Sequence, residues 1–484
     1  MNNEEEINST KKINLAAFGK ALAFFAMEIL AIVAFSLGNS FIFYTIAGLV
    51  LAVVSTIITR KQITKDGLST FAFFLFPIFV YGVLCALSYM RQDTYFDLQG
   101  LKVIFIPLGL SAFSAVGYFL SLVKEFKIKY AMIVIYSAIA ILVVINLIAT
   151  ITDFGFFHTI VYKGKYLFYD GKISGSSIND MAMSLMGFKM SEVSIRFFSF
   201  LPSILLSAFI PLFFIKFNDD KKLFILYLVF GSIGLIALIL TPNKWTLVTD
   251  ALLVAVLTLL VLALKKKWGK RFLIVLGVFG GLVAIGLIIA TINAQTGSDN
   301  ALRSFIAGNS ILNKLFNANR IAAPINCALD GLFTTSRVLG TPINIYDYTY
   351  KQGLLVTGSW LFDSIYVSGL FGLGFFILIL VSGIRRMAMY YRNSDDSIQE
   401  KVTIIAFVFT FLTYTLVNFD ITPFIFKNTV IPMYENGVFL VTIFLLSYCF
   451  AKSEKPKENV EETAKENVEE NITMEEVKND EISL

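Results

Sequence analysis

Long apolar runs broken by short charged turns dominate this chain of 484 residues. The runs are about 20 residues long, which is the length that an α-helix needs to cross a hydrocarbon core of about 30 Å. Only 15% of the residues are charged, against roughly 25% in an average soluble domain. A lipid-facing β-barrel would show segments of about 10 residues that alternate apolar and polar, and no such alternation occurs. The sequence therefore predicts an all-α fold, a polytopic transmembrane helical bundle.

About twelve runs are long enough to span a membrane. The polar, acidic start has no cleavage site after its first run, so we interpret that run as a retained span, not as a signal peptide. The chain then divides into an N-terminal tail over 1–16, a membrane domain over 17–450 and a charged tail over 451–484, which we expect to be disordered. The predicted spans are 17–37, 40–58, 70–89, 103–122, 131–151, 198–215, 222–240, 245–264, 271–292, 359–383, 403–419 and 430–450.

Lysines and arginines cluster in alternate turns between these spans, for example Arg60 and Lys61, and Lys265 to Arg271. Basic turns of membrane proteins face the cytoplasm, so an even number of spans puts both termini there. Two long segments, 152–197 and 293–358, are then predicted outside the cell. The second is a long extracytoplasmic loop before the tenth span, and it is where we expect an active site.

Several kinds of site are excluded by the scarcity of the residues that they require. The chain has a single histidine, His158, and three widely separated cysteines, which predict neither a metal site nor a disulfide framework. It has no P-loop and no dinucleotide-binding glycine fingerprint. The net charge of +5 arises mostly in the turns, so it does not indicate nucleic-acid binding. We expect no metal, no cofactor and no nucleic-acid partner.

Basic residues on the predicted outer side run against the usual charge distribution of membrane proteins. Lys244 stands at the outer end of a span, and the loop over 293–358 contains Arg303, Arg320 and Arg337. A polyanionic ligand would explain them, because arginine grips phosphate oxygens with two parallel hydrogen bonds. The alternatives are a lysine that merely reaches the membrane surface and an ordinary solvated loop.

Carboxylates within or beside the spans are the other candidates, because a carboxylate in lipid is costly. Asp363 lies near the start of the span after the loop, and Asp420 and Glu435 flank the last outer turn. Glu28 lies within the first span. Each could instead be a structural partner for Lys244 or a loop arginine, and we favour that structural role for Glu28.

Three stretches between about 200 and 383 resemble a known family. They are LIALILTPNKWTLVTDALLVAVLTLLVL, NRIAAPINCALDGLFTTSRVLGTP and GSWLFDSIYVSGLFGLGFFILIL, in which Gly369 and Gly372 open the last span. They are similar to the O-antigen ligase and polymerase group of bacterial membrane glycosyltransferases. Asn243-Lys244 stands where the family usually has Ser-Arg. Gly358-Ser359 stands where its ligases have His-Asn, so the resemblance favours a polymerase.

The resemblance implies an oligosaccharide repeat unit polymerase of O-antigen or capsule type in a bacterial cytoplasmic (inner) membrane. Such an enzyme moves a growing glycan from polyprenyl diphosphate to the next lipid-linked repeat unit on the outer face of the membrane. Its partners would be polyprenyl-diphosphate-linked oligosaccharides, membrane lipids, and flippase and chain-length regulator proteins. The alternatives are a lipid-linked oligosaccharide flippase, which would keep its loops short and its charge in the bundle, and a ligase-like transferase.

Candidate roles follow for the residues singled out above. A diphosphate leaving group needs cations where negative charge develops, and deprotonation of a sugar hydroxyl needs a carboxylate nearby. Asp363 is the first candidate for the base, and Glu435 the second. The candidates for binding the diphosphate are Lys244, Arg303, Arg320 and Arg337.

Overall fold

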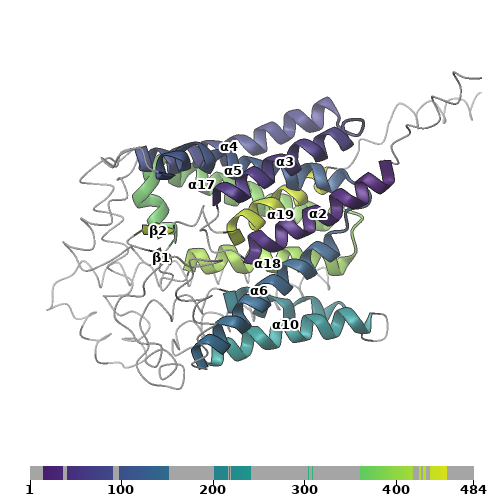
Figure 1. Cartoon of the computed structure of the whole chain (residues 1–484), viewed down its shortest axis with the longest axis vertical. Helices are drawn as coiled ribbons and strands as arrows, with labels where there is room; N and C mark the ends of the chain where they lie inside the picture. The colour runs from purple at the N-terminus through teal and green to yellow at the C-terminus, as the bar shows by residue number, and fades with distance from the viewer. Residues whose placement is uncertain are drawn as a thin grey trace, which may run out of the picture.

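The computed structural model shows a bundle of long helices that run side by side (Figure 1). It describes residues 15–35, 41–90, 98–151, 201–215, 217, 220–240, 304, 308, 360–417, 424–426, 429–431 and 437–454. The α-helices are α2 (Leu15–Phe35), α3 (Phe41–Thr59), α4 (Lys65–Met90), α5 (Leu98–Leu122), α6 (Ile128–Ile151), α10 (Lys221–Leu240), α17 (Trp360–Asn393), α18 (Ile398–Val417) and α19 (Gly437–Ser453). Two 3₁₀ turns, η1 (Ser207–Phe209) and η2 (Pro211–Phe213), and two strands, β1 (Phe424–Phe426) and β2 (Thr429–Ile431), complete the described elements.

Among the described residues, six helices are long and apolar enough to cross a membrane, and they make this a helical membrane protein. They are α2, α3, α4, α5, α10 and α17. Shorter apolar helices lie at 128–144, 201–213 and 437–453. The predicted spans 245–264 and 271–292 fall outside the described residues, so the count of twelve stays a prediction, as does the long loop over 293–358.

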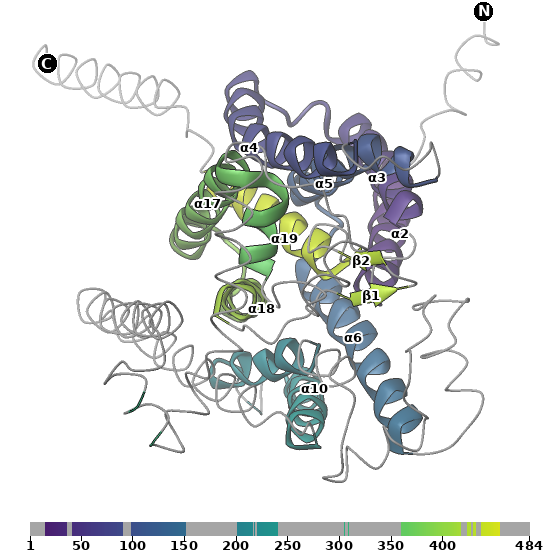
Figure 2. The same ribbon diagram turned by 90° about the vertical axis from the view of Figure 1, so that its left-hand side faces the viewer.

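Helix α5 lies at the centre of the larger part of the bundle. It packs against α3, α4 and α19, while α17 packs on both α4 and α19. Helix α6 joins this group through α2 and carries α10 on its other side, which Figure 2 shows from the end of the bundle. Helix α19 is buried along nearly its whole length, so it lies inside the bundle.

The contact between α5 and α19 is unusually close because small residues line it. A Cβ atom at Gly117 would overlap the carbonyl group of Phe444 on α19. One turn away the Ser114 and Ser447 hydroxyl oxygens are 2.7 Å apart in a buried hydrogen bond. Small residues let backbones approach in lipid, where apolar burial does not drive helices together, so packing and hydrogen bonds hold this pair.

Three predicted spans differ from the observed elements, and the one predicted at 359–383 continues in α17 to Asn393. The described part of the span predicted at 198–215 is helical from Leu201 to Leu206 and then tightens into η1 and η2, where Pro211 has no N–H to continue an α-helix. The span predicted at 430–450 is wrong at its start, because Thr429–Ile431 forms β2 and α19 begins at Gly437. Strand β2 pairs antiparallel with β1, with Ile425 opposite Val430, so the described fold is helical apart from this hairpin.

The turns that carry most of the basic residues meet at one end of the bundle, which we call the basic end (Figure 1). The side chain of Glu125, in the turn after α5, lies against Gly19 near the start of α2. Tyr118 and Glu454 both approach Gly67, just after the turn between α3 and α4. This agrees with the predicted alternation of basic clusters. The exposed basic residues of the described chain are Lys20, Arg60, Lys61, Lys65, Lys124, Lys127, Lys221, Lys222, Arg385 and Arg392.

Candidate functional site

Helix α17 is broken at Gly369, close to the end of the bundle opposite the basic end. Gly369 has φ 65° and ψ −162°, a backbone conformation that is essentially restricted to glycine. The first turns, from Trp360, therefore bend away from the rest of the helix (Figure 1). The side chain of Ser368 occupies the space that a Cβ atom at Gly372 would need. These are the two glycines that the resemblance put at the opening of the span.

The longer part of α17, beyond the break, is fixed by aromatic contacts to α4. The ring centroids of Tyr81 and Phe376 lie 5.6 Å apart, and those of Phe76 and Phe375 lie 6.3 Å apart with the rings edge to face. Gly383 packs against Leu446 of α19. Since the body of α17 is held on two sides, a change of conformation at Gly369 would move the first turns relative to the bundle.

Of the six residues proposed for the site, the structure describes the backbone of one. Asp363 lies in the first turns of α17, on the segment before the break. The other five lie outside the described residues: Lys244, Arg303, Arg320, Arg337 and Glu435. Their predicted roles therefore stay predictions.

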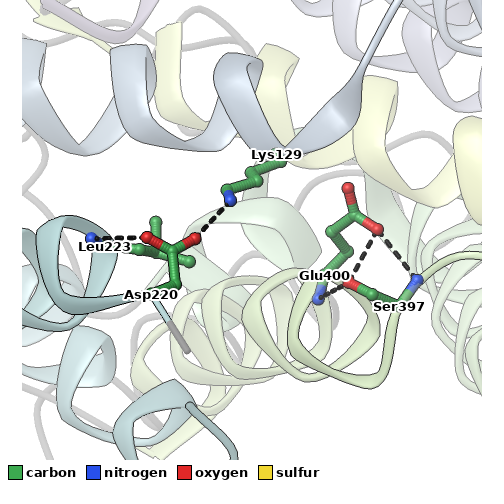
Figure 3. A network of polar contacts seen from close by, with 5 residues as sticks. All are labelled: Lys129, Asp220, Leu223, Ser397 and Glu400. Atoms are coloured by element: carbon green, nitrogen blue, oxygen red, sulfur yellow. Dashed lines mark hydrogen bonds and ion pairs between the residues drawn. The ribbon is translucent and has the colours of Figure 1, made fainter. Parts of the chain in front are cut away.

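At the basic end, Asp220 joins α6 to α10 (Figure 3). The Lys129 ammonium nitrogen lies 2.6 Å from Asp220 Oδ2, and Asp220 Oδ1 accepts a hydrogen bond of 3.2 Å from the Leu223 N–H. Asp220 is thus an N-cap of α10, which satisfies one of the free N–H groups of its first turn. The hydrogen bond from Lys129 holds the pKa of the Asp220 carboxyl below its ordinary value.

A capping box starts α18 at the same end. Glu400 Oε2 accepts hydrogen bonds of 2.8 Å from both the N–H and the hydroxyl of Ser397, and the Glu400 N–H donates back to Ser397 Oγ at 3.3 Å (Figure 3). The motif satisfies two free donors reciprocally. It fixes where the helix begins, so the carboxylate of Glu400 has a structural role.

Asp396, in the turn between α17 and α18, joins two buried tyrosines. Its Oδ2 atom accepts a hydrogen bond of 2.7 Å from the Tyr390 hydroxyl of α17 and one of 3.1 Å from the Tyr448 hydroxyl of α19. Lys401 donates to the carbonyl oxygens of Tyr391 and Ser394 in the same turn. The turn is therefore fastened to three helices at once.

The end of α19 is held by Arg386 of α17. Its guanidinium lies 4.1 Å from the centre of the Phe450 ring, and one of its nitrogens is 3.8 Å from a Glu454 carboxylate oxygen. Partial burial raises the pKa of the Glu454 carboxyl, and the charge of Arg386 offsets part of that rise. Arginine suits this position because its planar group stacks on the ring and pairs with the carboxylate together.

The polar recess between α6, α10 and α18 is too small to bind a sugar. It is lined by Lys129, Met132, Leu223, Tyr227, Gln399, Glu400 and Thr403, and it has room for about one water molecule. Within the described ranges, no group of three or more His, Cys, Asp or Glu side chains could hold a metal ion. Asp220, Asp396, Glu400 and Arg386 are the charged groups of the basic end that join helices or fix where they begin.

A scan against protein-family models and a search of curated proteins each found no match to this chain.

Sequence reasoning did not single out the polar network at the basic end. Two of its parts have local signals, because Ser397 and Glu400 have the spacing of a capping box before an apolar run and Asp220 directly precedes α10. The bonds of Asp396 to Tyr390 and Tyr448 have no such signal, because Tyr448 is far away in the sequence.

Proposed function

We propose that this protein is an oligosaccharide repeat unit polymerase of the cytoplasmic membrane, with its basic end in the cytoplasm and its active site at the opposite end. The positive-inside rule supports this orientation. The protein would transfer a growing glycan from polyprenyl diphosphate to the next lipid-linked unit. The observation that carries the proposal is the break of α17 at Gly369, at the end where the predicted outer loop leads into that helix.

The positions of the helix ends support an active site at this end of the bundle, formed by candidate residues from different parts of the chain. Helix α10 ends and α17 and α19 begin at the end opposite the basic end (Figure 1). Lys244 follows Leu240, the last residue of α10, by four positions, and Glu435 precedes Gly437, the first residue of α19, by two. Asp363 lies in the first turns of α17. On this proposal, three separate parts of the sequence would supply two carboxylates and a cation to one end of the bundle.

A broken helix is suited to an anionic substrate. In membrane proteins that bind ions or charged substrates, discontinuous helices present the positive ends of their dipoles to negative groups. The long part of α17 begins at the break with its N-terminus directed to the outer side, where the lipid-linked diphosphate would lie. The exposed Leu370 and Phe371 directly follow the break and would meet acyl or polyprenyl chains.

The proposed reaction forms one glycosidic bond and breaks one bond to phosphate. The acceptor hydroxyl oxygen attacks the anomeric carbon of the growing glycan, and the bond from that carbon to the phosphate oxygen breaks. Polyprenyl diphosphate leaves with the electron pair, and the hydroxyl proton passes to Asp363 or Glu435. The cations stabilise the negative charge on the leaving group; the candidates are Lys244, Arg303, Arg320 and Arg337.

The composition of the described core makes a flippase the weaker alternative. The buried polar side chains in that part of the chain are serines, threonines and tyrosines, and none of them is charged. A flippase that carries a charged lipid through the bundle needs charged groups along its path, and the described core supplies none.

The experiment is the surface polysaccharide ladder of cells in which the gene is deleted and then restored as wild type, Arg320→Ala or Lys314→Ala. Lys314→Ala is the matched control, because it removes another cation of the same predicted loop. We expect the deletion and Arg320→Ala to lose long chains while single repeat units still reach the surface. Accumulation of units on the inner leaflet after deletion would contradict the polymerase. A normal ladder from Arg320→Ala beside a defective deletion would keep the function and remove Arg320 from the site.

A further inference from the structure

Helix α2 carries a carboxylate in the middle of a face that no described helix covers. Glu28 is exposed, and its neighbours on that face are Ala21, Phe24 and Ile32, which recur at helical spacing and are also exposed. The opposite face is buried against the bundle, with Leu30 and Val33 fully enclosed. This outward face, which we call the Glu28 face, comprises Ala21, Phe24, Phe25, Glu28 and Ile32.

Glu28 lies too deep to reach water from its helix. The apolar span of α2 runs from Ala17 to Phe35, so at a rise of 1.5 Å per residue Glu28 lies about 16 Å from the first of these residues and about 10 Å from the last. A glutamate side chain extends only a few ångströms. The carboxyl group therefore faces the hydrocarbon core unless another molecule or segment covers it.

The favoured structural role for Glu28, as a partner for Lys244 or a loop arginine, stays a prediction, because those residues lie outside the described residues. No hydrogen bond or ion pair joins Glu28 to another described residue. A charged or polar side chain at this depth costs several kcal/mol in lipid and is found paired. The Glu28 face thus requires a donor that comes from outside the described bundle.

We infer that the Glu28 face binds a transmembrane helix of a partner protein that carries a cationic side chain at mid-membrane depth. Apolar side chains flank the carboxylate on both sides along the helix, and Phe24 is 64% exposed, so a partner helix can pack while its cation meets Glu28. A second copy of this chain fits poorly. Copies have the same orientation in the membrane, and two such faces would bring Glu28 against Glu28, which supplies a cation to neither carboxylate.

The test uses the full chain, labelled with a fluorescent donor, in phosphatidylcholine vesicles. Two synthetic transmembrane peptides of leucine and alanine carry an acceptor, one with a lysine at its centre and one with a leucine there. Energy transfer reports association. We expect the lysine peptide to bind the wild-type chain about tenfold more tightly than the leucine peptide, and Glu28→Leu to abolish this preference.

Ile57→Leu is the matched control, because Ile57 is 67% exposed on α3 and the substitution should leave the preference intact. Equal binding of the two peptides to the wild-type chain would overturn the inference, since it would mean that another segment of this chain already covers the face. A preference that survives Glu28→Leu would also overturn it. So would energy transfer between donor-labelled and acceptor-labelled copies of the chain that Glu28→Leu abolishes without any lysine preference. The assay contains no sugar, so its outcome is independent of the proposed polymerase activity.

Discussion

The two ends of this bundle are built in different ways. At the basic end the turns are short, α10 and α18 begin with side-chain caps, and Asp220, Asp396 and Arg386 each bridge two or more helices. At the opposite end α17 is broken at Gly369 and the strands are three residues long. The charged side chains that join these helices therefore have a structural role. The side-chain bonds at the basic end hold the helices together. The unusual backbone at Gly369 lies at the other end, where the backbone can be shaped for a purpose other than holding the helices together.

The largest effect should come from Gly369→Ala. A residue with a Cβ atom at φ 65° and ψ −162° is strained by about 1–3 kcal/mol, and relief of that strain would move the first turns of α17 and Asp363 with them. Because small displacements of catalytic groups reduce rates steeply, we expect polymer formation to fall about 100-fold. The measurement is the rate of chain growth from lipid-linked repeat units, with protein amount in the membrane determined in parallel.

Gly374→Ala is the control for this variant, because a Cβ atom at Gly374 meets nothing within 4 Å. It lies in the same helix and should leave the rate unchanged. If Gly369→Ala grows polymer at the wild-type rate, the break in α17 has no part in the chemistry and the contrast between the two ends loses its functional meaning.

A smaller effect, on stability alone, is expected from Asp396→Ala at the basic end. The substitution leaves the hydroxyls of the buried Tyr390 and Tyr448 without their shared acceptor, and an unsatisfied buried hydroxyl costs about 1–3 kcal/mol. Unfolding in mixed micelles should show this loss. Tyr448→Phe should cost less, and adding it to Asp396→Ala should cost little more, because both remove one interaction. Fully additive losses would show that the bond from Tyr448 to Asp396 does not contribute.

The smallest effect is expected on the stability of the fold at low pH. The pKa of Asp220 is lowered in the folded protein by Lys129, so this carboxylate contributes stability above the ordinary aspartate pKa, and that contribution disappears as the pH falls through the lowered folded value. Both side chains are about one third exposed, and such pairs are worth little. Asp220→Asn should therefore flatten the acid limb of a plot of melting temperature against pH only slightly. A steeper limb in the variant would contradict the assigned sign.

The lengths of the apolar runs predicted the helices well because span length and charge exclusion are local properties. The helices over Leu15–Phe35 and Phe41–Thr59 lie within a few residues of the predicted spans. The start of α19 was missed because Thr429–Ile431 is apolar enough for a helix but pairs with Phe424–Phe426, a contact between segments. The bonds of Asp396 to Tyr390 and Tyr448 were missed for the same reason, because they too are contacts between segments. The exposure of Glu28 depends on which face of α2 the bundle buries, and that is fixed only by packing.

The most direct test of the central claim is polymerisation by the purified chain in vesicles that contain polyprenyl-diphosphate-linked repeat units. We predict products of two, three and more repeats, with one polyprenyl diphosphate released for each bond formed, and a loss of both in Asp363→Asn. The contradicting result is that the units remain single while they cross the bilayer, which would make the protein a transporter of lipid-linked sugars.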